Sequence, residues 1–394
     1  MTSSSRAKWT TLLTPGVGAL LVLIATGIGV AAWRFLFGLS ATTNLDQQHP
    51  WGLWIAIDVS TGVALAAGGF TTAALVYVFH RESYHVLSRP ALLTALLGYT
   101  FVALGLLADL GRYYNIWHPI WPTMWQGNSV LFEVGICVTI YLTVLYVEFL
   151  PVACEWLMNE SRYPRIAYFC ERLNSVLKRT MILFILAGVV LSCLHQSSLG
   201  NLMVIAPSKV HPLWWTPILS LLFLLSAIAV GFPMVIVESL TASWAMGHRA
   251  EMELLSRLAR YIPVLLGIYA AFKIGDMLLR ASYRSLGDSF GTTLAFVIEM
   301  GLGVLLPMFL LMSERVRRSR RWLLWACMLV VLGVALNRVN VFLVAFRPPY
   351  SLKAYFPSVG EILVTLGLIS GLVLAYRVIV TYLPVISHAK VRSA

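Results

Sequence analysis

Ten apolar stretches, each close to the roughly 20 residues that a helix needs to cross a hydrocarbon core, dominate this chain of 394 residues. Hydrophobic residues make up 59% of the sequence and charged residues only 12%, with a mean hydropathy of +0.80. These values exclude a soluble domain and predict an all-α polytopic membrane protein with ten transmembrane helices. The predicted spans lie at residues 15–37, 51–79, 90–111, 128–152, 178–200, 214–240, 258–280, 290–313, 321–346 and 360–384.

The first stretch follows Arg6 and Lys8, as the apolar part of a signal peptide would. Its apolar run exceeds the 7–15 residues of a signal sequence, and no clear small-x-small cleavage site follows. We therefore expect a retained helix. The predicted organisation is a cytoplasmic N-terminal tail at residues 1–14, a ten-helix membrane domain at 15–385 and a cytoplasmic C-terminal tail at 386–394.

Lysine and arginine are distributed unevenly between the two sides of the predicted bundle. The side with both termini and the even-numbered loops carries 19 of them at or beyond the ends of the spans, and the other side carries 6. The positive-inside rule places the richer side in the cytoplasm. The net charge of +12 is thus explained by topology, and no nucleic-acid partner is needed.

A weak internal repeat predicts how the spans are grouped. Spans 2 and 6 both begin with a Pro-Trp-type segment, at Pro50-Trp51 and Pro212-Leu213-Trp214, and both continue into a tract of small residues. Spans 2–5 and 6–9 run in the same order of directions. We expect two four-helix bundles related by an axis along the membrane normal, with spans 1 and 10 as peripheral helices.

Charged residues inside the spans are functional suspects, because a bilayer core disfavours them. Few are expected in the inner half, and these are Glu148, Glu238 and Arg377. Pairs such as Asp109 with Arg112, or Lys273 with Asp276 and Arg280, could simply lock helices together. Their shared depth favours a polar site near the outer face instead. The residues in the outer half or at its rim are Asp58, Asp109, Arg112, Glu133, His195, Lys273, Asp276, Arg280, Glu299, Arg338 and Glu361.

The predicted outer loops are aromatic, rich in proline and low in charge. One interpretation is the interfacial belt of Trp and Tyr that most membrane proteins have. The other is a rigid platform on which a periplasmic partner docks. An aromatic crevice beside buried acids would also suit a quinone. The candidate docking residues are Trp117, Trp121, Trp125, Trp214, Trp215 and Tyr355.

Motifs for bound redox groups are missing. The five cysteines have no C-x-x-C spacing, which gives no support to an iron–sulfur cluster or a zinc site. A b-type haem needs two facing histidines within the membrane, and only His195 lies clearly within a span. There is no Walker A sequence, no dinucleotide fingerprint and no H-E-x-x-H. We expect no haem, no iron–sulfur cluster and no metal in this chain.

Several motifs closely resemble the NrfD-like family of polysulfide-reductase membrane subunits, and most of all its ten-helix HybB branch, which serves periplasmic nickel–iron hydrogenases. The resemblance runs from about residue 15 to 385. The segments that carry it are Pro50-Trp51-Gly52-Leu53-Trp54-Ile55-Ala56-Ile57-Asp58, Asp109-Leu110-Gly111-Arg112-Tyr113-Tyr114-Asn115, Asn128-Ser129-Val130-Leu131-Phe132-Glu133 and His195-Gln196-Ser197-Ser198-Leu199-Gly200.

The resemblance implies a quinone-reactive subunit of the bacterial cytoplasmic (inner) membrane that has no redox centre of its own. It implies that electrons pass between a periplasmic four-cluster ferredoxin-like iron–sulfur subunit and ubiquinone or menaquinone near the outer face. The implied catalytic partner is a nickel–iron hydrogenase with small and large subunits. Another periplasmic oxidoreductase or a multihaem cytochrome remains open as the partner.

Family quinone pockets lie in the first bundle, here spans 2–5. Many relatives have a Trp near Glu133, so pocket details do not transfer directly. His195 is the expected carbonyl ligand and proton donor, because imidazole exchanges protons near neutral pH; its alternative is a core histidine. Asp58 and Glu133 would relay protons or bond the second carbonyl. The implied quinone-binding set is His195, Gln196, Asp58, Asp109, Arg112, Tyr113, Glu133 and Trp51, and candidates for a proton path are Glu299, Lys273, Asp276, Glu148 and Glu238.

Two other functions fit part of the sequence. A secondary transporter would also have paired bundles and intramembrane charges. Against it, the polar residues crowd near one face, and few helices carry Gly/Pro interruptions at matching positions. A passive anchor for a periplasmic enzyme would need no quinone site.

Overall fold

The fold is helical and polytopic, as predicted. The computed structural model describes residues 14–160, 163–245, 247, 250–351 and 353–385, so most of both expected tails lies outside the described residues. Within these ranges, ten helices are long and apolar enough to cross a membrane. The β pairing that the described residues show is one isolated bridge, between Val210 and Phe346.

The first five spans contain most of the predicted residues, but spans 3, 4 and 5 extend beyond the predicted ranges. Span 1 is α2 (Pro15–Phe37), followed by the 3₁₀ turn η1 (Leu39–Ala41). Span 2 is segmented into η2 (Trp54–Thr61), α3 (Gly62–Leu65), α4 (Gly68–Ala73) and η3 (Ala74–Val78). Span 3 is η4 (Glu82–Leu87) with α5 (Ser88–Asp109), span 4 is α6 (Val130–Glu160), and span 5 is α7 (Pro164–Val204). Between α5 and α6 lie the short turns η5 (Tyr113–Asn115), η6 (His118–Ile120) and η7 (Pro122–Met124).

The second half of the chain follows the same pattern. Span 6 is α8 (Leu219–Ala245), and span 7 is α9 (Met252–Leu258) with α10 (Ile262–Leu279). The turn η8 (Ser282–Ser285) leads to span 8, made of α11 (Phe290–Met300), η9 (Gly301–Leu305) and α12 (Leu306–Met312). The short α13 (Glu314–Arg318) precedes span 9, which is α14 (Arg320–Val339) with η10 (Asn340–Val344), and span 10 is α15 (Val359–Tyr382).

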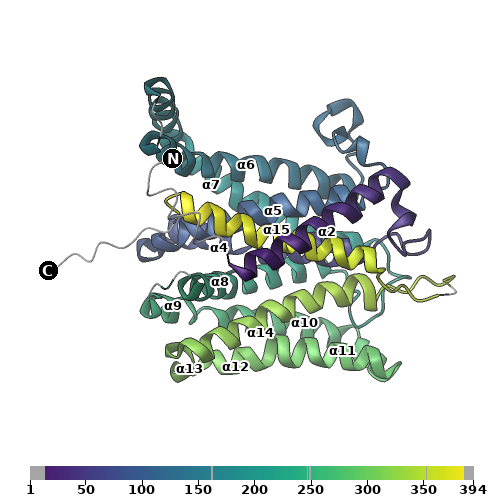
Figure 1. Cartoon of the computed structure of the whole chain (residues 1–394). Coiled ribbons are helices and arrows are strands. Elements are labelled where there is room, and N and C mark those ends of the chain that lie inside the picture. The colour runs from purple at the N-terminus through teal and green to yellow at the C-terminus, as the bar shows by residue number, and fades with distance from the viewer. Residues whose placement is uncertain (1–13, 161–162, 246, 248–249, 352, 386–394) are drawn as a thin grey trace.

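The packing of the helices confirms the two predicted bundles. In the first, α5 packs on η2, α4 and α6, and α6 packs on α7; in the second, α8 packs on α10 and α14, and α12 packs on the same two helices. Contacts of α8 with α7 and α4 join the bundles. The peripheral helices α2 and α15 pair with each other and lie against α5 (Figure 1). A Cβ added to Gly27 of α2 would lie 2.9 Å from Cα of Gly367, so this pair depends on small residues.

The two ends of the bundle differ in chemistry. The loops at 38–53, 110–129, 205–218, 280–289 and 345–358 share one end, which we call the aromatic end, and the opposite end is called the basic end. Near the basic end, α6 and α7 continue well beyond the predicted spans and project away from the bundle (Figure 1). Their polar ends remain helical although they have left the apolar stretches.

Span 2 is π-helical over its first two turns at the aromatic end, and span 9 ends in a π-helical turn at the same end. These two segments, η2 and η10, contact each other across the two bundles. A π-helix widens the turn and exposes backbone groups, and such segments are frequent at functional sites. The contact between η2 and η10 is therefore a candidate position for a functional site.

Candidate functional site at the aromatic end

Asp58 lies on the π-helical segment η2 and faces α5 and α15. Thr365 of α15 donates its hydroxyl hydrogen to Oδ2 of Asp58 over 2.6 Å. A Cβ on Gly105 of α5 would lie 2.9 Å from Cβ of Asp58, so α5 has a glycine where the acid approaches. Asp58 is 8% exposed. A carboxyl group is thus held at the junction of three helices, beside a single neutral donor.

Asp109, at the end of α5, belongs to the same group of charges. Arg34 of α2 and the carboxyl groups of Asp58 and Glu361 act on it electrostatically, and its Oδ1 atom is buried without a hydrogen-bond partner. Arg34 donates to the backbone carbonyl of Leu110. The predicted pairing of Asp109 with Arg112 is not what the described residues show, because Arg112 is exposed. The guanidinium near Asp109 is Arg34, which sequence reasoning left outside the site.

Glu361 closes this cluster on the loop side. It is the third residue of a capping box with Ser358 at the start of α15, and its Oε2 atom also accepts from the backbone amide of Asn44 over 3.2 Å. Tyr355 donates to Oε1 of Glu361, while the Tyr355 Oη atom accepts from the Leu53 amide over 2.9 Å. Burial raises the pKa of Tyr355, and the hydrogen bond to Glu361 acts in the same direction. The phenol therefore stays protonated and remains a donor.

A cavity of about 680 Å³ opens beside Tyr355, between spans 2 and 9 and the 345–358 loop. Its size falls within the range of small-molecule pockets, and most of its wall is apolar with a few polar groups. Leu53 and Ile57 line it, and Ile57 is the residue before Asp58 on η2. The other lining residues are His49, Val339, Leu343, Val344, Phe346, Arg347, Pro348, Ser351, Lys353, Ala354, Tyr355, Phe356 and Pro357.

His195 and Gln196 lie deeper, inside the first bundle. Both side chains are fully buried on α7. Nδ1 of His195 is 3.2 Å from the Tyr99 hydroxyl, and the Gln196 amide donates to the Val63 carbonyl over 2.8 Å. Nε2 of His195 and Oε1 of Gln196 have no hydrogen-bond partner among the described residues. Such buried unpaired atoms are uncommon in proteins and call for an explanation, for example a missing ligand or water.

The remaining members of the predicted quinone-binding set are scattered over the aromatic end. Glu133, on the first turn of α6, is half-buried, and its carboxyl group has no hydrogen bond within the described ranges. Tyr113 packs on Phe35 and lies 5.2 Å from the Arg34 guanidinium. Trp51 packs on Phe342 and Phe346 of span 9 and its loop. Among the described members of this set, Asp58 and Asp109 share one electrostatic cluster, and Tyr113 adjoins it through Arg34.

In the second bundle, Glu299 is enclosed by three donors. Trp214 and Asn340 donate to its Oε2 over 2.8 and 2.7 Å, and Asn337 donates to its Oε1 over 2.7 Å. Next to it, the buried Arg338 donates to Asn337 Oδ1 and lies 3.7 Å from the centre of the Phe223 ring. This arrangement satisfies a buried charge, as a structural core network does.

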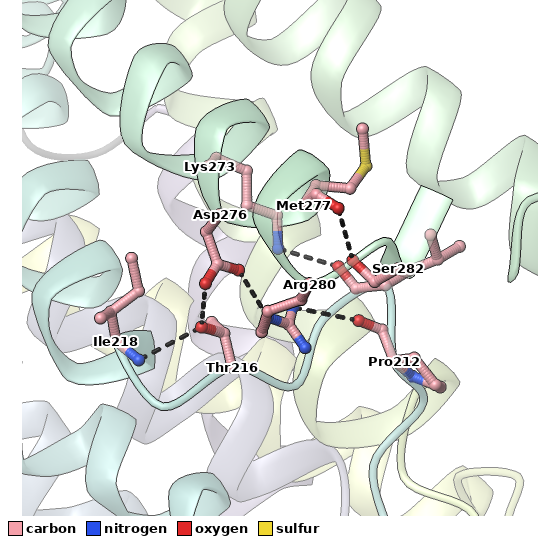
Figure 2. A network of polar contacts seen from close by, with 9 residues as sticks. Pro212, Thr216, Ile218, Lys273, Asp276, Met277, Arg280 and Ser282 are labelled. Atoms are coloured by element: carbon pink, nitrogen blue, oxygen red, sulfur yellow. Dashed lines mark hydrogen bonds and ion pairs between the residues drawn. The ribbon is translucent and has the colours of Figure 1, made fainter. Parts of the chain in front are cut away.

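Lys273, Asp276 and Arg280 of α10 face the loop that precedes α8 (Figure 2). The predicted pairing of Asp276 with Arg280 is present at 2.9 Å, whereas the Lys273 ammonium donates to the Leu213 carbonyl over 3.0 Å. Thr216 donates to the other oxygen of Asp276. These contacts tie the second bundle to its loop at the aromatic end, and they include two of the residues predicted for a proton path.

The two inner acids are far apart in the sequence and sit on different helix pairs. Oε1 of Glu238 accepts from Tyr376 of α15 over 2.7 Å, and its Oε2 is buried without a partner. Glu148 of α6 lies against Gly188 of α7, where an added Cβ would be 2.6 Å from its Oε1. No hydrogen bond within the described ranges connects either acid to Glu299, Lys273 or Asp276.

The predicted docking residues divide into exposed and buried groups. Trp117, Trp121 and Trp125 are 47%, 57% and 50% exposed on the 110–129 loop. Trp214 is fully buried and donates its indole N–H to Glu299. It therefore offers no docking surface. Trp215 donates to the Val204 carbonyl, and Tyr355 faces the cavity.

Sequence reasoning missed several polar partners. Arg34, Tyr99 and Thr365 hold predicted site residues, but each is one polar residue within an apolar span and no motif identifies it. Arg34 carried the clearest signal, because a lone arginine three residues from the end of an apolar stretch needs a nearby acid or carbonyl.

Comparison with known proteins shows the family of this chain. The family described as polysulphide reductase, NrfD, matches residues 41–346. The chain belongs to the NrfD family. This match covers spans 2–9 and therefore both four-helix bundles.

Relatives align along nearly the whole chain. A protein of Nitratidesulfovibrio vulgaris is 39% identical over 388 residues, 95% of each chain. The "probable Ni/Fe-hydrogenase 2 b-type cytochrome subunit" of Escherichia coli is 37% identical over 365 residues, 91% of this chain and 88% of the relative. The "menaquinone reductase, integral membrane subunit" of N. vulgaris is 26% identical over 390 residues, 92% and 90% of the two chains. The chain is therefore a multi-span membrane protein whose relatives are membrane subunits of oxidoreductase complexes.

The name of the E. coli relative contains a b-type cytochrome, and a b-type haem would need ligands from this chain's residues. Among the described residues, no group of three or more His, Cys, Asp or Glu could hold a metal ion. His195 has a tyrosine as its neighbour, and the other described histidines lie in loops or at span ends. The described residues do not offer the pair of facing histidines that a b-type haem requires.

Proposed function

We propose that this protein is the quinone-reactive membrane subunit of a respiratory oxidoreductase complex. Its role is to pass electrons between a partner iron–sulfur subunit, bound at the aromatic end, and the quinone pool. The observation that carries the proposal is that buried polar atoms without partners among the described residues occur at predicted quinone-binding residues of an NrfD-family chain. Three predicted quinone-binding residues of this NrfD-family chain, His195, Gln196 and Asp109, each keep a buried polar atom without a partner.

The chemistry needs hydrogen bonds to two carbonyl oxygens and a source of two protons for each two-electron reduction. His195 Nε2 can give one hydrogen bond and a proton, with Tyr99 holding the ring in place through Nδ1. Nε2 of Gln196 donates to the Val63 carbonyl, so the position of the Gln196 amide is fixed by the backbone of span 2. Asp58 and Asp109 can hold exchangeable protons, because Asp58 is paired only with the neutral hydroxyl of Thr365 and Asp109 interacts with two other carboxyl groups, those of Asp58 and Glu361, and with one guanidinium, that of Arg34.

In this proposal, protons pass through the cavity between the cluster of Asp58, Asp109 and Glu361 and the outer aqueous phase. Ile57 lines the cavity, and Asp58 is the next residue on the wide π-helical turn. Tyr355 borders the cavity and binds Glu361, which acts on Asp109. Protons taken up or released at Asp58 and Asp109 would exchange through this opening. Glu133, half-buried on α6, is kept as a peripheral relay residue in this proposal.

The proposed orientation puts the basic end and both tails in the cytoplasm of a bacterial inner membrane, following the bias of lysine and arginine. The exposed Trp117, Trp121 and Trp125 then face the periplasm as docking residues for the iron–sulfur subunit. Similarity to the hydrogenase 2 subunit supports a nickel–iron hydrogenase as the catalytic partner. The proposal includes proton translocation through Glu299, Lys273, Asp276, Glu148 and Glu238 only as an additional function. The hydrogen bonds of the described residues leave these five residues in separate networks.

The test is purification of the tagged protein from its host in mild detergent, with mass spectrometry of the subunits that accompany it. The complex is then assayed for reduction of a soluble quinone analogue by hydrogen. The proposal expects an iron–sulfur protein with hydrogenase subunits, and activity that a quinone-site inhibitor abolishes. A lone protein without redox activity would contradict it and favour the transporter function.

A further inference from the structure

The polar extension of α7 at the basic end has a surface that the quinone proposal does not use. Residues 163–180 carry four basic side chains and one acidic one, together with exposed aromatic rings. Tyr168 and Phe169 are 64% and 65% exposed. This part of α7 adjoins the apolar stretch that begins after Thr180, so it lies where the chain leaves the hydrocarbon core.

A shallow, open depression of about 570 Å³, which we call the α7 cavity, lies on one face of this extension, and all the residues that line it belong to α7. Tyr168, Arg172, Ser175 and Arg179 line it at spacings of four, three and four residues, which places them on a single helix face. Arg172 and Arg179 are two turns apart, about 10 Å along the axis. The cavity is also lined by Glu171, Val176 and Thr180.

The two guanidinium groups have no acidic partner among the described residues. Among the described residues, the guanidinium of Arg172 has one hydrogen bond, a long one of 3.5 Å to the Tyr168 hydroxyl, and the guanidinium of Arg179 has none. Exposed acids elsewhere do pair with arginines in this chain, as in Glu314 with Arg318 at 2.7 Å. The free fork-shaped donors of Arg172 and Arg179, with the Ser175 hydroxyl between them, suit an oxyanion with several acceptor oxygens.

We propose that this face of α7 is a binding site for the phosphate headgroup of an anionic glycerophospholipid. The geometry supplies guanidinium groups for the phosphate, and the exposed side chains of Val176 and Tyr168 offer apolar contact for the start of the acyl chains. Basic groups at the end of a membrane helix attract anionic lipids of the cytoplasmic leaflet. The assignment to that leaflet rests on the proposed orientation, whereas the lipid site itself does not depend on quinone chemistry.

The experiment compares three full-length proteins purified in mild detergent: the wild type, R172Q/R179Q and R165Q/K178Q. The second double variant removes the same charge from the same exposed extension, but neither of its residues lines the cavity. Native mass spectrometry measures bound dioleoylphosphatidylglycerol, with dioleoylphosphatidylcholine and inorganic phosphate as comparison ligands. Thermal unfolding with each ligand gives an independent measurement.

We expect wild type and R165Q/K178Q to bind dioleoylphosphatidylglycerol about equally, and R172Q/R179Q to bind it about tenfold more weakly. Equal loss in both double variants would overturn the proposal in favour of diffuse charge attraction. Equal stabilisation by inorganic phosphate would overturn it in favour of a soluble anion site. Quinone reduction by the complex is measured in parallel. A lipid defect with full quinone activity separates this site from the proposed function.

Discussion

The phenol of Tyr355 donates a hydrogen bond to the carboxylate of Glu361, and so links the cavity at the aromatic end to the first turn of α15. The same oxygen accepts the Leu53 amide at the start of span 2. One side chain therefore joins a loop after span 9, the N-terminus of span 10 and the beginning of the π-helical segment that carries Asp58.

The Tyr355→Phe variant tests this link. It removes the donor to Glu361 and leaves the Leu53 amide without its acceptor, which we expect to cost about 1–3 kcal/mol in unfolding free energy. The measurement is the midpoint of thermal unfolding in detergent. Tyr350→Phe is the matched control, because Tyr350 is 84% exposed and its loss should leave the midpoint unchanged. Equal midpoints for Y355F and wild type would contradict the assigned role.

Asp58→Asn separates proton exchange from structure. The amide oxygen of asparagine can still accept the Thr365 hydroxyl, so the loss of stability should not exceed the roughly 1 kcal/mol that is typical of a point substitution. Quinone reduction should fall at least tenfold, since an amide cannot take up and release a proton. Thr365→Val is the complementary variant, which keeps the carboxyl group and loses its 2.6 Å donor. It should retain more activity than D58N, and the reverse order would refute a proton role for Asp58.

The tryptophans of the aromatic end should behave in two different ways. Trp121→Ala removes an exposed ring, so the partner subunits should be lost from pull-downs while thermal stability is kept. Trp214→Ala should cost about 3–5 kcal/mol, because it empties a buried site and removes a donor to Glu299. If W121A unfolds as early as W214A, the 110–129 loop is a structural element and the docking hypothesis for it is wrong.

His211 should make the aromatic end sensitive to acid. Burial and then the nearby Arg347 lower the pKa of His211, while Asp288 acts in the opposite direction. Nδ1 of the ring accepts the Leu213 amide over 3.3 Å, which requires the neutral form at that atom. The folded state thus disfavours protonation, so stability should be constant above the unfolded pKa of roughly 6.5 and fall as pH drops below it.

Thermal unfolding at pH 7.5 and pH 5.5 tests this sign. His211→Gln, which does not titrate, should have a smaller difference in midpoint between the two pH values than the wild type has. A wild-type protein that becomes more stable at pH 5.5 through a stronger His211–Asp288 pair would show that the ion pair at 3.4 Å dominates.

The number of spans and their grouping could be predicted because apolar length and small-residue tracts act locally. The lengths of α6 and α7 could not, since their polar ends remain helical after leaving the apolar stretch. The position of Asp58 beside Thr365 joins residues 307 positions apart, and no local pattern reports such a contact. Trp214 was misjudged as a docking residue because an indole before a span is typical of the interface, and only the position of Glu299 shows that it is buried.

The central claim is that quinone reacts at His195, and one pair of rates on the purified complex tests it most directly. The wild-type and His195→Ala complexes are compared for hydrogen-dependent reduction of a soluble quinone analogue and of a viologen dye, which takes electrons directly from the hydrophilic subunits. The account predicts an assembled H195A complex with full viologen activity and a loss of quinone reduction of about 100-fold or more. An H195A complex that reduces the quinone analogue at the wild-type rate would contradict it.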